Sequence, residues 1–177
     1  MKRYLVPVAC VLYFAIALYG GEMVLSSPDF KDMQALPDKT TCYGDGVSPA
    51  LSWSAAPKET KSFVLILDDP DAVGGVVWDH WIVYDIPASV HEIAEGRLPK
   101  EAKLGKSTNE KHTYVAPCPP KGSGVHGYRF RLYALDIKSV PSKVDTKEAL
   151  LQLIKPHILA EATLIGKYEK RKKFLFF

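Results

Sequence analysis

Two aspartates and two histidines stand at the ends of apolar segments in this sequence. Asp69 and Asp71 lie in the turn D-D-P-D-A, directly after an apolar run that ends at Leu67. His80 lies between two tryptophans in W-D-H-W, and His126 begins the segment H-G-Y-R-F. A buried charge is costly unless it is paired, and an imidazole titrates near neutral pH. We therefore expect these side chains to form a small polar pocket that binds an anion such as phosphate.

The same inventory gives little support to covalent or metal chemistry. No serine stands in a G-x-S-x-G nucleophile motif, and no glycine-rich phosphate loop precedes a predicted helix. Neither C-x-x-C nor a zinc-type spacing of histidine and cysteine occurs. We expect a non-catalytic protein without cofactor or metal. The alternative is an enzyme that uses His80 as a general base oriented by Asp69.

Three apolar segments are expected to be the strands that position these residues. Residues 61–67 form an almost continuous apolar run, which is typical of a strand covered on both faces. Residues 76–86 and 127–136 alternate in the manner of half-buried strands. In the first of these two, strict alternation places His80 on the same face as Trp78 and Ile82.

One helical region is expected near the end of the chain. Asp145 is the predicted N-cap, with Glu148 as the second half of a capping box, and Pro156 ends the helix. Residues 158–164 are predicted to add a further helical turn or two, before residues 164–168 return as a strand. The thirteen prolines and twelve glycines are spread along the chain and favour many short strands joined by turns. The fold class that we predict is mainly β.

Composition indicates one globular domain, and the N-terminal residues indicate export from the cell. The chain has 177 residues, of which 47% are hydrophobic and 24% charged, enough for a single buried core. A net charge of +3 is too small to indicate a nucleic-acid partner. Lys2 and Arg3 precede an uncharged run over residues 4–19, which is typical of a secretory signal. We assign residues 1–20 to a signal peptide or an N-terminal membrane anchor, and expect a periplasmic or secreted protein.

Two further features remain open from the residues alone. Cys42 and Cys118 are the cysteines left after removal of a leader, and they fit either one disulfide or two separate buried thiols. Residues 169–177 form a basic and aromatic tail, E-K-R-K-K-F-L-F-F. We expect this tail to fray, and contact with a membrane surface is the alternative. Nothing in the sequence predicts the oligomeric state.

A series of short motifs resembles the phosphatidylethanolamine-binding protein family, in particular its bacterial and archaeal Raf-kinase-inhibitor-like branch. In order, they are S-P-A-L-S-W from Ser48, D-P-D-A from Asp69, W-D-H-W from Trp78, P-C-P-P-K-G from Pro117, G-V-H-G-Y from Gly124, Y-A-L-D from Tyr133 and H-I-L-A-E-A from His157. None of them is diagnostic alone, but their common order and spacing are specific. The likeness covers about residues 41–168, and we assign residues 21–168 to one domain of this type.

The resemblance implies a mainly β fold in which a large antiparallel sheet packs on a smaller one, with a few short helices near the C-terminus. It also implies a shallow pocket for phosphate-type anions, in proteins that bind or inhibit others and share no catalytic reaction. Carried over residue by residue, the expected ligand-binding residues are Asp69, Asp71, Trp78, His80, Pro119, Pro120, His126 and Tyr128.

The sequence departs from the family pattern at Val73, Ala116 and Gly127, where proline, glycine and arginine are usual. Gly127 removes a positive charge beside the expected pocket, whereas the other two changes affect loop shape. The expected partner is a small anionic or phosphorylated ligand. The alternative is a protein partner, a kinase or a hydrolase that the chain inhibits or regulates through surface loops.

Overall fold

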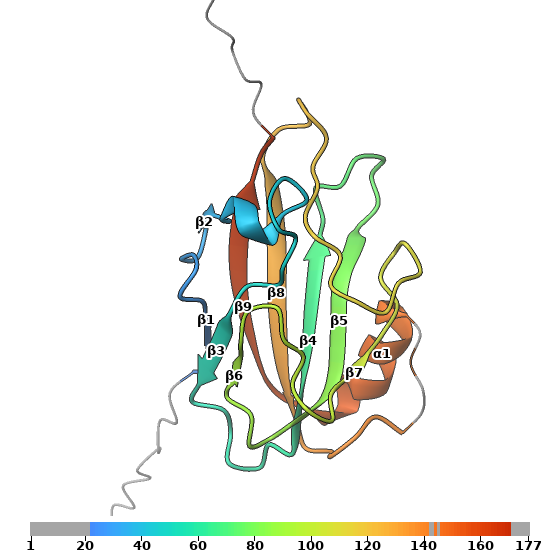
Figure 1. The fold of residues 1–177 in the computed structure, drawn as a ribbon. Coiled ribbons are helices and arrows are strands. Elements are labelled where there is room, and N and C mark those ends of the chain that lie inside the picture. Colours follow the sequence, from blue (N-terminus) through green and yellow to red (C-terminus); the bar gives the residue numbers. More distant parts are fainter. Residues whose placement is uncertain (1–21, 142–143, 145, 171–177) are drawn as a thin grey trace, which may run out of the picture.

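The computed structural model describes residues 22–141, 144 and 146–170. The expected leader, the predicted Asp145 cap and residues 171–177 of the tail lie outside the described residues. Within the described part, nine strands form two sheets, with one short α-helix beside the larger sheet (Figure 1). No helix in this part is long and apolar enough to cross a membrane. The predicted mainly β, two-sheet fold is confirmed.

The larger sheet carries the strands that the sequence predicted. Its order is β2 (Gln34–Ala35), β9 (Ile158–Tyr168), β8 (His126–Leu135), β4 (Ser62–Asp69), β5 (Trp78–Pro87) and β7 (Lys103–Leu104). Neighbouring strands are antiparallel, except that β2 pairs with β9 in parallel. Because β4 lies between β8 and β5, the end of β4 lies beside the beginnings of both neighbours.

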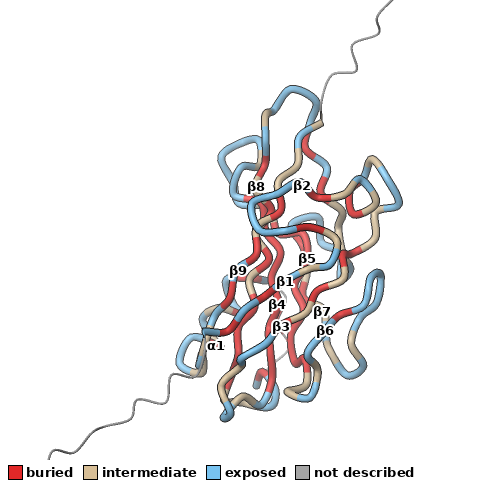
Figure 2. The backbone as a smooth tube through the Cα atoms, turned by 90° about the vertical axis from the view of Figure 1, so that its left-hand side faces the viewer, coloured by how far each residue is buried: buried red, intermediate tan, exposed pale blue. Residues whose placement is uncertain are grey.

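The smaller sheet covers one face of the larger. It consists of β1 (Val24–Ser26), β3 (Leu51–Ser54) and β6 (Glu92–Ile93), in the order β1-β3-β6. A hydrophobic core fills the space between the sheets, where Trp53 of β3 meets Phe63 of β4 edge-on at 5.2 Å between ring centroids. Figure 2 shows the buried residues running through the long central strands, with exposed residues on the surrounding loops.

The opposite face of the larger sheet is covered by α1 (Lys147–Ile154), together with Val140 and Val144 before it. Leu150 and Ile154 of α1 pack with Val64 and Ile66 of β4 in a second core. All of β4 is therefore buried, as its continuous apolar run predicted. The chain also forms two single 3-10 turns, η1 (Asp38–Thr40) and η2 (Lys155–His157).

Two predictions about the end of the chain are wrong. The N-cap of α1 is Thr146, whose hydroxyl accepts a hydrogen bond from the Ala149 N–H at 3.2 Å. Residues 158–164 are not helical, because β9 begins at Ile158 and pairs with β8 along its whole length. Ala162 and Leu164 are buried on one face of β9, so the period of this segment is that of a strand. Pairing with a neighbouring strand outweighed the local helical pattern.

The predicted orientation of His80 is right for Trp78, which lines the same cavity, but wrong for Ile82, because β5 contains a β-bulge at His80. Leu67 of β4 pairs with Trp81 of β5, but the next residue of β4, Asp68, pairs with Asp79. His80 is thus the extra residue, and a bulge re-aims the side chain at its position. The ring lies on the face of Trp81 and contacts Tyr128 of β8, whereas Ile82 belongs to the core on the α1 side.

Candidate functional site

A cavity of about 350 Å³ lies where β4 ends and where β5 and β8 begin. We call it the pocket. It is lined by Asp69, Ala72, Val73, Trp78, His80, Asn109, Val115, Ala116, Cys118, Pro119, Pro120, His126 and Tyr128. The sheet contributes the aspartate, tryptophan, histidines and tyrosine, and the loop before β8 contributes the two prolines and the cysteine. The structure therefore brings together all the predicted ligand-binding residues except Asp71.

Asp71 supports the pocket from outside its lining. Its backbone N–H donates to Asp69 Oδ1 at 2.8 Å, and its Oδ2 accepts the N–H of Gly127 at 2.8 Å. The turn after β4 is thereby tied to the start of β8. An ideal Cβ at Gly127 would stand only 3.3 Å from Asp71 Oδ2, so the glycine allows this close approach.

His126 is held by hydrogen bonds at both ring nitrogens. Its Nδ1 lies 2.7 Å from Asp69 Oδ2, and its Nε2 lies 2.8 Å from the hydroxyl of Ser123. A carboxylate accepts, so Nδ1 carries a proton. Ser123 also donates to Pro120 O at 2.8 Å. The ring is thus oriented by its neighbours, and sequence reasoning missed Ser123 because a serine in a turn carries no distinguishing motif.

Among the described residues, only the Nδ1 nitrogen of His80 has a hydrogen-bond partner. Its Nδ1 lies 2.8 Å from Val115 O, and the Val115 N–H donates back to His80 O at 2.9 Å. The ring stands edge-on to Tyr128, with 5.4 Å between centroids. Burial lowers the pKa of His80, and its bond to the Val115 carbonyl and the nearby Asp69 charge oppose this only in part.

Tyr128 forms the floor between the two histidines. It is 1% exposed and stacks on His126 at 6.2 Å between ring centroids. Burial, together with the negative charge of Asp69, raises the pKa of the Tyr128 phenol above its ordinary value. The residue therefore stays an uncharged phenol throughout the physiological range.

Asn109 is a second lining residue that sequence reasoning missed. Its Oδ1 accepts the hydroxyl of Ser107 at 2.7 Å, which leaves the amide N–H groups free to donate. Asn109 comes from the loop after β7, which looked like featureless surface in the sequence. Among the described residues that line the pocket, none is lysine or arginine. The polar groups of the pocket side chains are therefore an amide, a carboxylate, a phenol, an indole N–H and two imidazoles.

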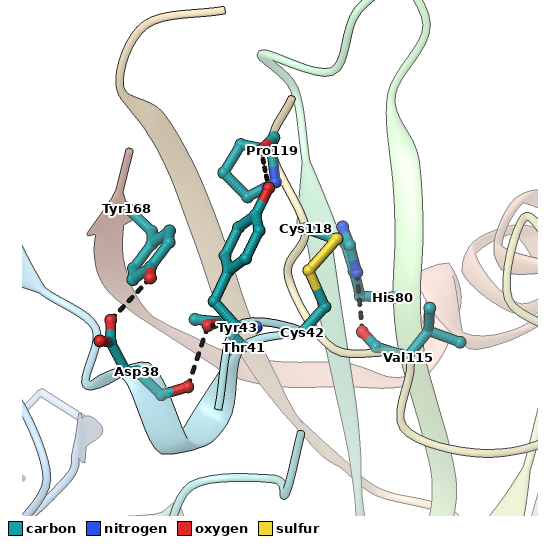
Figure 3. Close-up of a disulfide and its surroundings, with 9 residues drawn as sticks. All are labelled: Asp38, Thr41, Cys42, Tyr43, His80, Val115, Cys118, Pro119 and Tyr168. Carbon is teal, nitrogen blue, oxygen red and sulfur yellow. Dashed lines mark hydrogen bonds between the residues drawn. A yellow bond between two sulfur atoms is a disulfide. The ribbon is translucent and has the colours of Figure 1, made fainter. Parts of the chain in front are cut away.

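The wall formed by residues 115–120 is fastened to the segment after η1 (Figure 3). Cys42 and Cys118 form a disulfide with 5.3 Å between their Cα atoms. The Cys42 N–H donates to Pro117 O at 3.0 Å, and the Tyr43 hydroxyl donates to Pro119 O at 2.6 Å. Residues 115–120 belong to no strand, so their position is set by the bonds between Val115 and His80 at one end and by the cross-link and the Cys42 and Tyr43 bonds at the other.

A separate charge cluster lies behind the pocket, on the α1 side of the same strands. Asp68 is completely buried and accepts hydrogen bonds from Arg129 at 2.8 Å and Arg131 at 2.7 Å. Lys147 of α1 lies 3.4 Å from Asp68 and also bonds Asp79. Burial alone would raise the pKa of Asp68, but the Arg129 bond and the neighbouring positive charges bring it below its ordinary value. The cluster fixes α1 to the sheet.

Comparison with known proteins agrees with this architecture. A sequence model described as phosphatidylethanolamine-binding protein matches residues 26–169. A UPF0098 protein of Methanothermobacter thermautotrophicus is 42% identical over 153 residues, which cover 84% of this chain and 99% of the relative. The crystal structure of a phosphatidylethanolamine-binding protein homologue, CT736 of Chlamydia trachomatis, superposes with a TM-score of 0.78 at 42% identity and covers 84% of this chain and 98% of its own. A relative in Mycobacterium tuberculosis that carries the name lipoprotein LppC is 35% identical, covering 83% of this chain and 72% of that protein.

Proposed function

Because the chain belongs to the phosphatidylethanolamine-binding protein family, we propose that it is a non-catalytic binding protein whose pocket takes a small phosphate-type anion. The observation that supports this most directly is the convergence of Asp69, His80, His126 and Tyr128 on one cavity of about 350 Å³. A cavity of this size fits a small ligand.

The pocket is suited to binding because its polar groups are already positioned. Asp69 and Ser123 orient the ring of His126, and Val115 orients that of His80. Trp78, Pro119 and Pro120 add rigid apolar surface, which loses little conformational entropy when a ligand is bound. Ser123 and His126 form a hydrogen-bonded pair, but the Ser123 N–H is already bonded to Pro120 O at 3.1 Å. That donor is not free to stabilise an oxyanion, so we favour binding over catalysis.

The proposal includes export. The basic and apolar leader supports it, and so does the relative that carries a lipoprotein name. An accessible disulfide also fits an oxidising compartment, since both Cys42 and Cys118 are exposed. Mass spectrometry of the mature protein from its native envelope tests this: a start near residue 20 is expected, and an intact Met1 would contradict removal of the leader.

Calorimetric titration tests the binding function. Phosphate, phosphorylethanolamine and a phosphotyrosine analogue are the probes, and at least one should bind. His80→Ala should weaken that binding about tenfold or more, because it removes a polar partner in a desolvated pocket. His91→Ala is the matched control, since His91 is exposed and outside the pocket. Absence of heat from every probe with the wild-type protein would contradict the proposal.

A second candidate function is the regulation of a kinase or hydrolase through surface loops. Exposed apolar side chains support it: Val73, Val76 and Val77 in the loop between β4 and β5, and Val125 in the loop before β8, are each 43–65% exposed. These loops adjoin the pocket. Recovery of an enzyme in stoichiometric amount with the protein from its native envelope, lost in a Val76→Asp/Val77→Asp variant, would favour this function over ligand binding alone.

A further inference from the structure

The hydrogen bond at Nδ1 of His80 determines what its other nitrogen can do. Val115 O is a carbonyl oxygen and only accepts, so Nδ1 carries the proton in every charge state of the ring. In the neutral ring, Nε2 then has a lone pair and no hydrogen. His80 lines the pocket, and Nε2 has no hydrogen-bond partner within residues 22–141, 144 and 146–170. The pocket therefore contains an unused hydrogen-bond acceptor.

The groups around His80 favour the neutral ring. Burial disfavours the imidazolium most strongly, and the charge of His126 on β8 acts in the same direction. The Val115 carbonyl, Asp69 and Asp68 oppose these effects, yet the pKa of His80 remains lowered. Tyr128, the other titratable residue in ring contact, is an uncharged phenol. At neutral pH, Nε2 of His80 is therefore an acceptor.

The other polar groups of the pocket do not donate a hydrogen bond to this acceptor. Asp69 also accepts, and its two oxygens are already bonded to the Asp71 N–H and to His126. Both nitrogens of His126 are engaged as well. The donors in the lining are the Asn109 amide, the indole N–H of Trp78 and the phenol of Tyr128, of which the phenol bonds Asp69. Within the described residues none of them bonds Nε2 of His80. An oxyanion that carries no hydrogen would bring a lone pair against the lone pair of His80, and a buried acceptor without a donor is unfavourable.

We infer that the pocket selects an oxyanion that carries its own hydrogen, namely a phosphate monoester in its monoanionic form. The P–O–H group donates to Nε2 of His80, and an unprotonated oxygen accepts from the Asn109 amide. Two related ligands are discriminated against: phosphate diesters, which have one charge and no hydrogen, and sulfate, which has two charges and no hydrogen at neutral pH. This inference rests on the proposed function and adds the protonation state and ester class of the ligand.

Calorimetry at pH 7 with methyl phosphate, dimethyl phosphate and sulfate tests the inference. Methyl phosphate should bind at least about tenfold more tightly than the other two. Dimethyl phosphate has the same single charge as the monoanion of methyl phosphate but no P–O–H group. The comparison of these two ligands therefore measures the effect of the hydrogen at constant charge. The second pKa of a phosphate monoester is about 6, so the fraction present as the monoanion falls about tenfold between pH 7 and pH 8. The Kd of methyl phosphate should rise by the same factor, with about one proton taken up per ligand bound at pH 8.

The outcomes separate the two proposals. Dimethyl phosphate or sulfate binding as tightly as methyl phosphate would overturn the inference and leave the binding function in place. No binding of any probe would overturn both. His80→Gln places an amide N–H donor near Nε2, so it should reduce the preference for methyl phosphate over sulfate to less than about threefold. His91→Gln should leave that preference unchanged, and the wild-type comparison decides the question even if His80→Gln does not fold.

Discussion

The two faces of the larger sheet use neighbouring residues in opposite ways. Asp68 and Asp79 point to the α1 side, where Arg129, Arg131 and Lys147 neutralise them. The next residues along each strand, Asp69 and His80, lie at the pocket, where the lining supplies no lysine or arginine. The carboxylates of the charge cluster are paired with its own cations, whereas the pocket retains an unused acceptor and an unused amide. The position of an ionisable residue on the sheet, more than its type, therefore separates the residues of the charge cluster from those of the proposed ligand site.

The largest expected effect is on the structural side of this comparison. Asp68→Ala should lower the free energy of unfolding by about 3–5 kcal/mol, because it leaves buried positive charges without their acceptor. Denaturant unfolding measures this change. Asp136→Ala is the control, since its ion pair with His157 is substantially exposed and should contribute less than about 1 kcal/mol. Equal effects of the two substitutions would contradict a structural role for the cluster.

On the pocket side, the position of residues 115–120 should depend on the Cys42–Cys118 disulfide and not on ion pairs. Cys42→Ser with Cys118→Ser should lower the free energy of unfolding by about 2–4 kcal/mol, because the bond closes a loop with a sequence separation of 76. It should also weaken ligand binding, since Cys118, Pro119 and Pro120 line the pocket. Reduced wild-type protein is the matched comparison and should behave like the double variant. Unchanged stability and affinity in both would contradict this dependence.

Asp71 provides a finer test of the boundary of the pocket. Asp71→Ala should lower the free energy of unfolding by about 1 kcal/mol, because it removes the acceptor of the Gly127 N–H. It should change the Kd of the ligand by less than about threefold, since the residue lies outside the lining. Unfolding and calorimetry on the same sample measure both quantities. A loss of binding as large as that of His80→Ala would restore Asp71 to the ligand-binding residues that the sequence predicted.

The two faces should also respond to different ranges of pH. The pKa of His80 is lowered from 6.5 by burial, so the unfolded chain takes up its proton first and stability falls as pH drops below about 6.5. The pKa of Asp68 is lowered from 3.8, so its contribution is present above that value and is lost as pH falls further. Unfolding curves recorded across this range should lose the upper step in His80→Gln. Retention of that step would assign it to another group.

The sequence predicted the strands better than the contacts between them. The run ending at Leu67 could be recognised as a buried strand because apolar residues on both faces leave a local pattern. The bulge at His80 could not, because a register shift depends on the partner strand, β4. The first half of β9 was missed for the same reason. Pairing with β8 decides its conformation, and a single-sequence pattern does not contain that information.

The candidate site was predictable only in part, and through the family likeness. The resemblance named residues from β4, β5 and β8 together, which periodicity alone could not have brought to one place. The resemblance could not distinguish residues that line the pocket from residues that hold the lining in place. Asp71 was therefore included, although it lies outside the lining and accepts a hydrogen bond from the Gly127 N–H. Ser123 and Asn109 were missed because loop geometry brings each of them to the site. Such positions leave no local signal in the sequence.

The claim that the pocket holds the ligand can be checked with a crystal structure of the protein with a bound phosphate monoester. We predict the phosphoryl group inside the pocket, with one oxygen about 2.7–3.0 Å from His80 Nε2 and another at a similar distance from the Asn109 amide nitrogen. A phosphoryl group bound elsewhere on the molecule, with the pocket left to solvent under saturating ester, would contradict the claim.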